Sequence, residues 1–238
     1  MLADKGLGHD DFARERFTDD TFQGSGAGKS TLLRHMLGLR QPSSGSVKIM
    51  GKELTALGKK DLNTLRKKIG VAFQGGALLT SMNVGDNVAL PLREHTRLDE
   101  NTIRIMTRMK LEMVNLAGCE KLMPAELSGG MLKRTALARA VIMDPRVLFI
   151  DEPTSGLDPI TAVEIDELII NLRTAMNMTI VVITHELQSA LKIADRITVL
   201  CEGKAIFIGT VQQLQQSDDT YIKSFLNRSP PSTTIWRR

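Results

Sequence analysis

Residues 24–31, with the sequence GSGAGKST, are of the types that binding a polyphosphate requires. Small residues allow backbone N–H groups to point at phosphate oxygens, a lysine contacts the outer phosphates, and a hydroxyl ligates Mg²⁺. Leu32, Leu33 and Leu37 follow at helical spacing, which places the loop at a helix N-terminus that favours negative charge. The pattern predicts a nucleotide site, with Lys29 on the β- and γ-phosphates and Ser30 on Mg²⁺, formed by Gly24, Ser25, Gly26, Ala27, Gly28, Lys29, Ser30 and Thr31.

The surroundings of this loop depart from the expected pattern. The motif G-x-x-x-x-G-K-[ST] begins with a glycine at position 23, where the chain has Gln23. A buried strand should precede the loop, yet residues 18–21 are polar and turn-prone. A glycine-serine turn without a ligand therefore stays an alternative for this segment taken alone.

Two carboxylates follow an apolar run in VLFIDEP, residues 147–153. Ligands bind at the carboxyl ends of strands in open α/β sheets, so we expect Asp151 and Glu152 to lie at a site. Asp151 suits a Mg²⁺ ligand, and Glu152 suits a base that orients and deprotonates an attacking water. Taken alone, the pair is equally compatible with the capping of a turn.

A second candidate phosphate site occurs in LSGGM, residues 127–131, at the start of another predicted helix. Two such sites in one chain are redundant, unless Ser128, Gly129 and Gly130 bind the nucleotide held by the other protomer. This arrangement predicts a head-to-tail homodimer. A loop with a serine N-cap is the simpler alternative.

Short apolar runs alternate with helical patterns, which indicates an α/β fold with a buried, largely parallel sheet. The runs cover 47–50, 69–73, 147–151, 179–184 and 197–200. A helical insert of about 75–145 separates the second run from the third, with apolar side chains at helical spacing at Ile103, Met106, Met109, Met113 and Leu116. Such a stripe is typical of core packing, and a docking surface is the alternative.

A further helix is predicted to begin at Asp158-Pro159, an N-cap residue followed by proline at the first helical position. Its apolar face recurs at helical spacing and is expected to be buried, at Ala162, Ile165, Leu168, Ile169, Leu172 and Met176.

The composition of the chain excludes several classes of protein. Hydrophobic residues make up 42% and charged residues 24%, as in an ordinary globular protein. The net charge of +4 is not gathered into a basic stripe, which argues against nucleic acid as a partner. No apolar run approaches the roughly 18 residues that span a bilayer, and the acidic N-terminal segment lacks a secretory signal. Cys119 and Cys201 lack metal-site spacing. We therefore expect a cytosolic protein whose membrane role requires a partner.

Six segments in this order resemble the motifs of ABC ATPases: GSGAGKST, Gln74, LSGGM, VLFIDEP, SGLDP and Thr184-His185. The resemblance implies a P-loop NTPase fold with a helical subdomain at about 75–145 and an ABC ATPase domain over 23–227, flanked by an atypical N-terminal segment, 1–22, and a polar basic tail, 228–238. It also implies ATP and Mg²⁺ as cofactors. In that family LSGGQ is the usual signature, and Met131 stands here in place of the glutamine.

The same resemblance implies roles for three further residues. Gln74 would sense Mg²⁺ and the attacking water, Asp158 would communicate across the dimer, and His185 would contact the γ-phosphate. The catalytic candidates are thus Glu152 and His185, and the Mg²⁺ ligands are Ser30, Asp151 and Gln74. Two strands and an aromatic that stacks on adenine should precede the loop, and Phe12, Phe17 and Phe22 do not match it. We therefore expect the N-terminal strands to be missing or altered.

A narrower resemblance involves MNVGDNVALPLREHT, residues 82–96, together with KLMPAELSGGM, residues 121–131. These segments are similar to the ATPase of the Mla phospholipid-transport, or organic-solvent-tolerance, family. The likeness implies an integral membrane permease, an MCE-type lipid-binding protein, a small STAS-like subunit, and a place on the cytoplasmic face of the bacterial inner membrane.

Three alternatives remain open from the sequence. Gln23 and the missing strand favour a degenerate or regulatory subunit. A DNA-repair type of ABC ATPase would carry a long coiled coil, and no heptads occur between Leu39 and Leu127. A ribosome-acting protein of this family would usually hold two cassettes, whereas this chain has the motifs of one.

Overall fold

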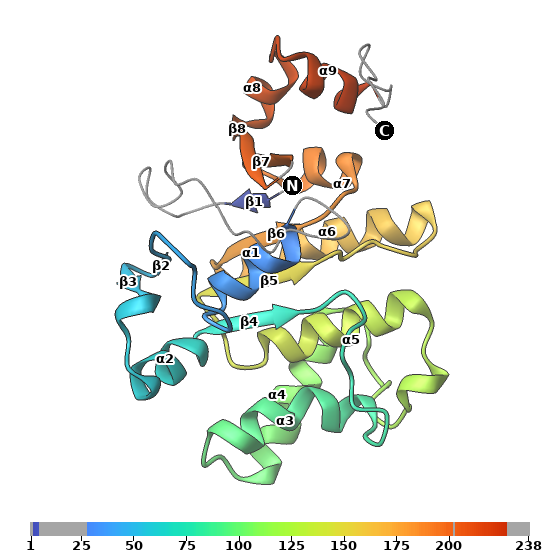
Figure 1. Ribbon diagram of the computed structural model, residues 1–238. Helices are drawn as coiled ribbons and strands as arrows, with labels where there is room; N and C mark the ends of the chain where they lie inside the picture. Colours follow the sequence, from blue (N-terminus) through green and yellow to red (C-terminus); the bar gives the residue numbers. More distant parts are fainter. Residues whose placement is uncertain (1, 5–27, 202, 228–238) are drawn as a thin grey trace.

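The computed structural model describes residues 2–4, 28–201 and 203–227, and its centre is a six-stranded sheet in the order β4-β5-β6-β1-β7-β8 (Figure 1). β4, β5 and β6 are parallel, and β1 is antiparallel to both β6 and β7, so β7 runs in the direction of β6. The α/β fold with a largely parallel sheet is confirmed. The strands are β1 (Leu2–Asp4), β4 (Ile69–Ala72), β5 (Val147–Asp151), β6 (Thr179–Ile183), β7 (Arg196–Cys201) and β8 (Lys204–Thr210).

One predicted strand lies outside this sheet. The run at 47–50 contributes β2 (Lys48–Ile49), which pairs with β3 (Lys52–Glu53) in a separate two-stranded hairpin. The chain reverses at Met50 and Gly51, whose φ angles of 52° and 72° suit a two-residue hairpin turn. Placing this run in the main sheet was wrong, because the turn directly after it returns the chain along the same short strand. The turn η1 (Leu54–Ala56) and α2 (Lys59–Arg66) follow.

The alternation of side chains along β5 and β6 divides the core into two layers. Val147 and Phe149 face a cluster that includes the apolar side chains of α1 (Lys29–Met36). Leu148 and Ile150 face the opposite cluster, which contains buried side chains of α5 (Gly129–Val141) and α6 (Pro159–Met176). Both faces of these central strands are therefore covered, which explains why their sequences are continuous runs of apolar residues.

The helical insert lies at the β4 edge of the sheet, toward the bottom of Figure 1. It contains α3 (Val84–His95), α4 (Glu100–Met113), η2 (Pro124–Glu126) and α5 (Gly129–Val141). Ile103 and Leu116 are buried as expected, but Met109 is 58% exposed and does not belong to the core. Core packing was therefore wrong for Met109, because its side chain lies on the solvent-facing side of α4, whereas Thr107 and Leu111, two positions to either side, are buried.

α6 (Pro159–Met176) begins where the sequence predicted, with Asp158 as N-cap and Pro159 as the first helical residue. Its predicted face is buried at Ile165, Leu168, Ile169 and Leu172. α7 (Leu187–Ile193), α8 (Val211–Gln215) and α9 (Thr220–Leu226) complete the described fold. Within the ranges 28–201 and 203–227, no helix combines the length and hydrophobicity that crossing a bilayer demands.

Candidate functional site

The lysine of the predicted phosphate loop begins α1. Gly28 precedes it with a φ of 76°, a left-handed conformation that glycine adopts without steric cost. Nζ of Lys29 lies 3.3 Å from Oε1 of Glu152. The loop lysine and the carboxylate after β5, which are 123 positions apart, therefore meet at one place.

Glu152 occupies the turn directly after β5 and is only 8% exposed. Its φ of 50° is a left-handed conformation that costs a non-glycine residue roughly 1–2 kcal/mol. The backbone N–H of Glu152 donates to the carbonyl of Ile183 at 2.8 Å, which ties the turn to the end of β6. The carboxylate thus faces the site from a strained but well-anchored turn, a combination common at functional positions.

Two residues after β6 hold the other oxygen of this carboxylate. Oε2 of Glu152 accepts from the hydroxyl of Thr184 and from the backbone N–H of His185, both at 3.3 Å. Nδ1 of the His185 ring lies 2.8 Å from the same oxygen. The structure therefore brings together the two residues that the sequence proposed as catalytic.

The electrostatics of the two neighbouring carboxyls differ. Burial alone would raise the pKa of Glu152, but the hydrogen bond from His185 and the charge of Lys29 outweigh it and hold that pKa below its usual range. Burial and the adjacent Glu152 charge raise the pKa of Asp151, against the opposing charges of Lys29 and Lys133. Glu152 is accordingly kept ionised, as a general base must be.

Lys133 links α5 to both loops of the site. Its Nζ donates to the backbone carbonyl of Gln74 at 2.5 Å and to that of Glu152 at 2.7 Å, and it lies 3.5 Å from the hydroxyl of Ser155. Nε2 of Gln74 also lies 3.5 Å from that hydroxyl. The loops after β4 and β5 are therefore joined through one lysine of the helical insert.

The remaining predicted residues lie at helix starts or outside the described structure. Ser128 caps α5 by accepting from Met131 N–H at 3.3 Å, and Asp158 caps α6 by accepting from the backbone N–H groups of the next turn. A Cβ added to Gly130 would lie 2.7 Å from Cγ2 of Thr161, so the two helix starts lie against each other. Gln23, the loop residues 24–27, the upstream segment 18–21 and the three phenylalanines judged not to match the adenine-stacking aromatic fall outside the described residues.

The carboxyl of Asp151 fits a magnesium ligand. The described residues contain no cluster of three His, Cys, Asp or Glu side chains able to hold a metal. Mg²⁺ in nucleotide sites needs fewer, because one or two protein ligands act together with phosphates and water. A half-buried carboxyl whose pKa is raised beside a second carboxylate is also a position where a bound cation would favour ionisation.

The sequence did not predict the roles of Lys133 and Arg139, nor the hydrogen bond that the Thr184 hydroxyl donates to Glu152. The Arg139 guanidinium donates to the carbonyls of Gly76 and Ala77 at 2.6 and 2.8 Å, which fixes the loop after Gln74 against α5. One signal was available for Lys133, because it lies four residues after Gly129 and therefore on the same helix face.

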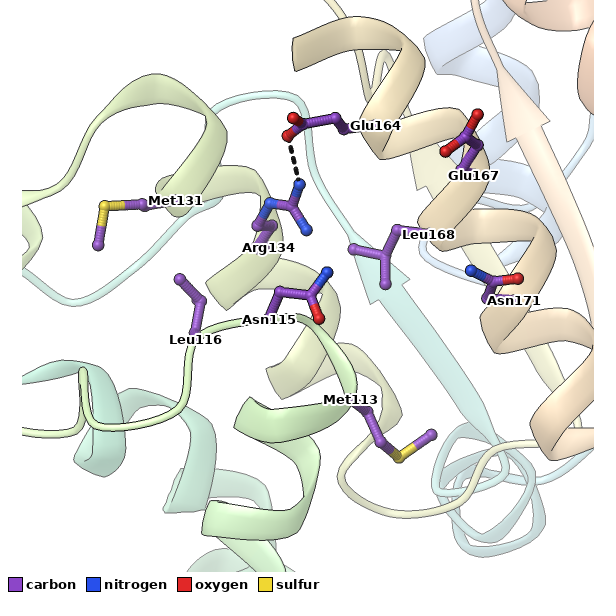
Figure 2. Close-up of a pocket in the computed structure, with 9 residues that line it drawn as sticks. All are labelled: Met113, Asn115, Leu116, Met131, Arg134, Glu164, Glu167, Leu168 and Asn171. Atoms are coloured by element: carbon purple, nitrogen blue, oxygen red, sulfur yellow. Dashed lines mark hydrogen bonds and ion pairs between the residues drawn. The ribbon is translucent and has the colours of Figure 1, made fainter.

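A cavity of about 560 Å³ lies between the end of α4, α5 and α6, apart from the Glu152 cluster (Figure 2). Arg134, on its wall, donates to Glu164 at 2.8 Å and to the carbonyl of Val114 at 3.2 Å. This ion pair joins the helical insert to α6. The cavity is lined by Met113, Asn115, Leu116, Met131, Arg134, Glu164, Glu167, Leu168 and Asn171.

Known proteins similar to this chain are ATP-binding proteins of transporters. The family model described as ABC transporter matches residues 24–155. The chain is 45% identical over 202 residues to the intermembrane phospholipid transport system ATP-binding protein MlaF of Haemophilus influenzae, which covers 85% of this chain and 76% of that protein. It is 41% identical over 203 residues to the probable ribonucleotide transport ATP-binding protein mkl of Mycobacterium tuberculosis, covering 85% and 56% respectively.

Among solved structures, the dimeric post-hydrolysis state of the ATP-binding cassette MJ0796 bound to ADP and Pi is 31% identical, with a TM-score of 0.71 over 78% of this chain and 81% of that one. The fold is that of a P-loop ATPase. The chain belongs to the ABC transporter family and is an ATP-binding subunit with ATPase activity.

Proposed function

We propose that two copies of this chain hydrolyse ATP on the cytoplasmic face of a bacterial inner membrane and energise phospholipid transport through a permease. The relative at 45% identity is named for intermembrane phospholipid transport, and the relative at 41% is named for ribonucleotide transport. The higher identity, with the greater share of the relative covered, favours a phospholipid as cargo.

The observation that carries the proposal is the convergence of Lys29 and His185 on the carboxylate of Glu152. Lys29 would bind the β- and γ-phosphates, together with the backbone of residues 24–31. Glu152, kept ionised by its neighbours, would orient the attacking water and accept its proton. His185 would hold that carboxylate in place and contact the γ-phosphate.

The residues that would hold Mg²⁺ are Ser30, Asp151 and Gln74. When bound, the ion would neutralise charge that develops on the phosphate oxygens. Asp151 provides a carboxylate at the end of β5, and Gln74 provides an amide after β4, at the neighbouring strand end. The carboxyl ends of parallel strands meet at one edge of a sheet, which favours a shared role for these two side chains.

The dimer is proposed to place Ser128, Gly129 and Gly130 of one chain against the nucleotide held by the other. The related MJ0796 cassette is a dimer in its structure with ADP and Pi. Ile160 and Val163, beside Asp158, are 75% and 46% exposed, which favours an interface at the start of α6. Asp158 would lie in this interface and communicate between the two sites.

The remaining assignments concern partners and boundaries. An integral permease would contact the segment 74–92, next to the exposed side chains of Phe73 and Leu79. An MCE-type lipid-binding protein and a small STAS-like subunit would complete the transporter. The ABC ATPase domain would cover 23–227 with a helical subdomain at about 75–145, between an atypical segment, 1–22, and a polar basic tail, 228–238.

Glu152→Gln tests the catalytic proposal, because it removes the base while keeping the shape of the side chain. Steady-state hydrolysis by the purified full chain should fall by about 10²- to 10⁴-fold, with binding of a fluorescent ATP analogue retained. Glu167→Gln is the matched control, since Glu167 pairs with Lys192 at the surface of α6 and should leave turnover unchanged. Near-normal hydrolysis by the Glu152→Gln protein would rule out this base.

The cargo requires a second experiment with the membrane partners present. The chain is co-purified with its permease and reconstituted into vesicles, and ATP-dependent movement of a fluorescent phospholipid is compared with that of a labelled ribonucleotide. Phospholipid movement that stops with Glu152→Gln supports the proposal. Movement of the ribonucleotide alone would contradict the cargo while leaving the ATPase assignment intact.

A further inference from the structure

Lys133 is a half-buried lysine that contacts three acceptors, none of which is a carboxylate. Its ammonium contacts the backbone carbonyls of Gln74 and Glu152 and the hydroxyl of Ser155, at 2.5, 2.7 and 3.5 Å. An ammonium has three donor hydrogens, so this set of acceptors matches its full donor capacity. The side chain therefore belongs to a defined site rather than to a solvated surface.

The two carbonyls belong to the residues on which the proposed reaction depends. Glu152 is the proposed base, and its strained φ of 50° must be maintained by contacts around it. Four residues contact its backbone N–H or its carboxylate: Lys29, Ile183, Thr184 and His185. The carbonyl, at the other end of the same residue, accepts from Lys133 at 2.7 Å and from the backbone N–H of Ser155 at 3.4 Å. Lys133 makes the shorter of these two bonds and so limits rotation of the peptide that follows Glu152.

Lys133 also lies on the helix that begins with the signature residues. Gly129, the first residue of α5, is one helical turn before Lys133 on the same face. The neighbouring Arg134 points elsewhere, to Glu164 on α6 (Figure 2). It also donates to the carbonyl of Val114. A displacement of the start of α5 would accordingly be transmitted through Lys133 to the loops that carry Gln74 and Glu152.

We propose that Lys133 is a positioning residue for ATP hydrolysis, which couples the placement of the signature helix to the orientation of Glu152 by holding the carbonyls of Gln74 and Glu152. It acts on the backbone of these residues and does not contact the nucleotide. The inference rests on the proposed role of Glu152 as the base. It adds a connection within one chain to the contacts expected between two chains.

The test compares three variants of the full chain, Lys133→Met, Lys133→Gln and Lys133→Arg. Methionine keeps the length of the side chain and removes every donor, so kcat should fall by about 10- to 100-fold, as for a misplaced catalytic group, with KM for ATP within about twofold of the wild type. Arginine keeps the charge and the donors and should retain most of the turnover. Glutamine should give an intermediate value, and it replaces methionine if that variant does not fold.

A double-mutant cycle separates this role from a general effect on folding. If Lys133 acts through Glu152, Lys133→Met should cost little further in single-turnover hydrolysis when Glu152→Gln is already present. Lys192→Met, which removes a surface lysine paired with Glu167, is the control and should change neither parameter. Penalties that multiply in the double variant, or a Lys133→Met protein with normal kcat, would overturn the inference.

The two proposals fail in different ways in this experiment. A normal rate for Glu152→Gln alone removes the proposed base, whatever Lys133 does. A low rate for Glu152→Gln together with a normal rate for Lys133→Met removes only the positioning role.

Discussion

Gly70 lies on β4 beneath α5, and its replacement by alanine measures how closely the helical insert is held to the sheet. A Cβ at this position would lie 2.2 Å from the carbonyl oxygen of Ala140 and 3.0 Å from Cδ1 of Leu148. Ordinary van der Waals contact begins at 3.4 Å. Because the nearer atom belongs to the backbone of a helix, it has no rotamer to adopt, and α5 would have to move from β4 by about 1 Å.

Overpacking of a core commonly costs about 1–3 kcal/mol, and a clash with backbone belongs at the upper end of that range. For a chain of this size, each 1 kcal/mol shifts Tm by about 2–4 °C, so Gly70→Ala should lower Tm by roughly 6–12 °C. Thermal and urea unfolding of the full chain, followed by circular dichroism, measure the change. Turnover should fall as well, because the same movement displaces Lys133 on α5.

Gly58→Ala is the matched control for this prediction. Gly58 precedes α2 with a φ of −67°, and nothing lies within 4 Å of an added Cβ. This variant should stay within about 0.5 kcal/mol of the wild type. If the Gly70→Ala protein proved as stable as the Gly58→Ala protein, the close packing of α5 on β4 would be refuted.

Three further predictions concern single side chains. Burial raises the pKa of Asp166, so ionising this carboxyl destabilises the folded protein as pH rises through that raised pKa. Asp166→Asn should therefore have the same free energy of unfolding as the wild type below about pH 4 and a larger one at higher pH. Urea unfolding at several pH values measures the difference. His185→Ala removes a hydrogen bond that lowers the pKa of Glu152, so the acid limb of the pH profile of kcat should move to higher pH, and an unmoved limb contradicts the assignment. Arg134→Met should cost about 1–2 kcal/mol in urea unfolding, less than a fully buried pair, because the Glu164 side chain is 55% exposed.

The sequence predicted the central strands well because burial on both faces leaves an unambiguous apolar pattern. β5 and β6 were located within a residue of their ends, and α6 was located from Asp158 and Pro159, whose capping chemistry is local. β8 was not predicted, since its side chains are mostly exposed and its run has no strong alternation. β2 was assigned to the wrong sheet, because pairing depends on where the chain turns rather than on the strand itself.

The residues of the site were predictable where a motif fixes their chemistry and not where the fold alone brings them together. Glu152 and His185 were identified separately, and the structure adds the 2.8 Å contact between them. Lys133 and Arg139 donate to backbone carbonyls of residues 74–77 and 152. Every residue has a backbone carbonyl, so the sequence does not indicate which of them accepts such a bond. Contacts of this kind become visible only when the loops are placed in space.

The two lysines of the site differ in how they respond to a phosphate. Lys29 contacts Glu152 through a single ion pair at 3.3 Å, and a polyphosphate carries more negative charge than one carboxylate, so the nucleotide would compete for this lysine. Glu152 would then lose one of the charges that lower its pKa. Lys133 is bound to carbonyls and has no carboxylate contact to exchange, so it would remain beside the acidic pair. The positioning of Glu152 should consequently depend more on Lys133 when nucleotide is bound than when it is absent. Lys133→Met is therefore expected to lower kcat and to leave the affinity for ATP nearly unchanged.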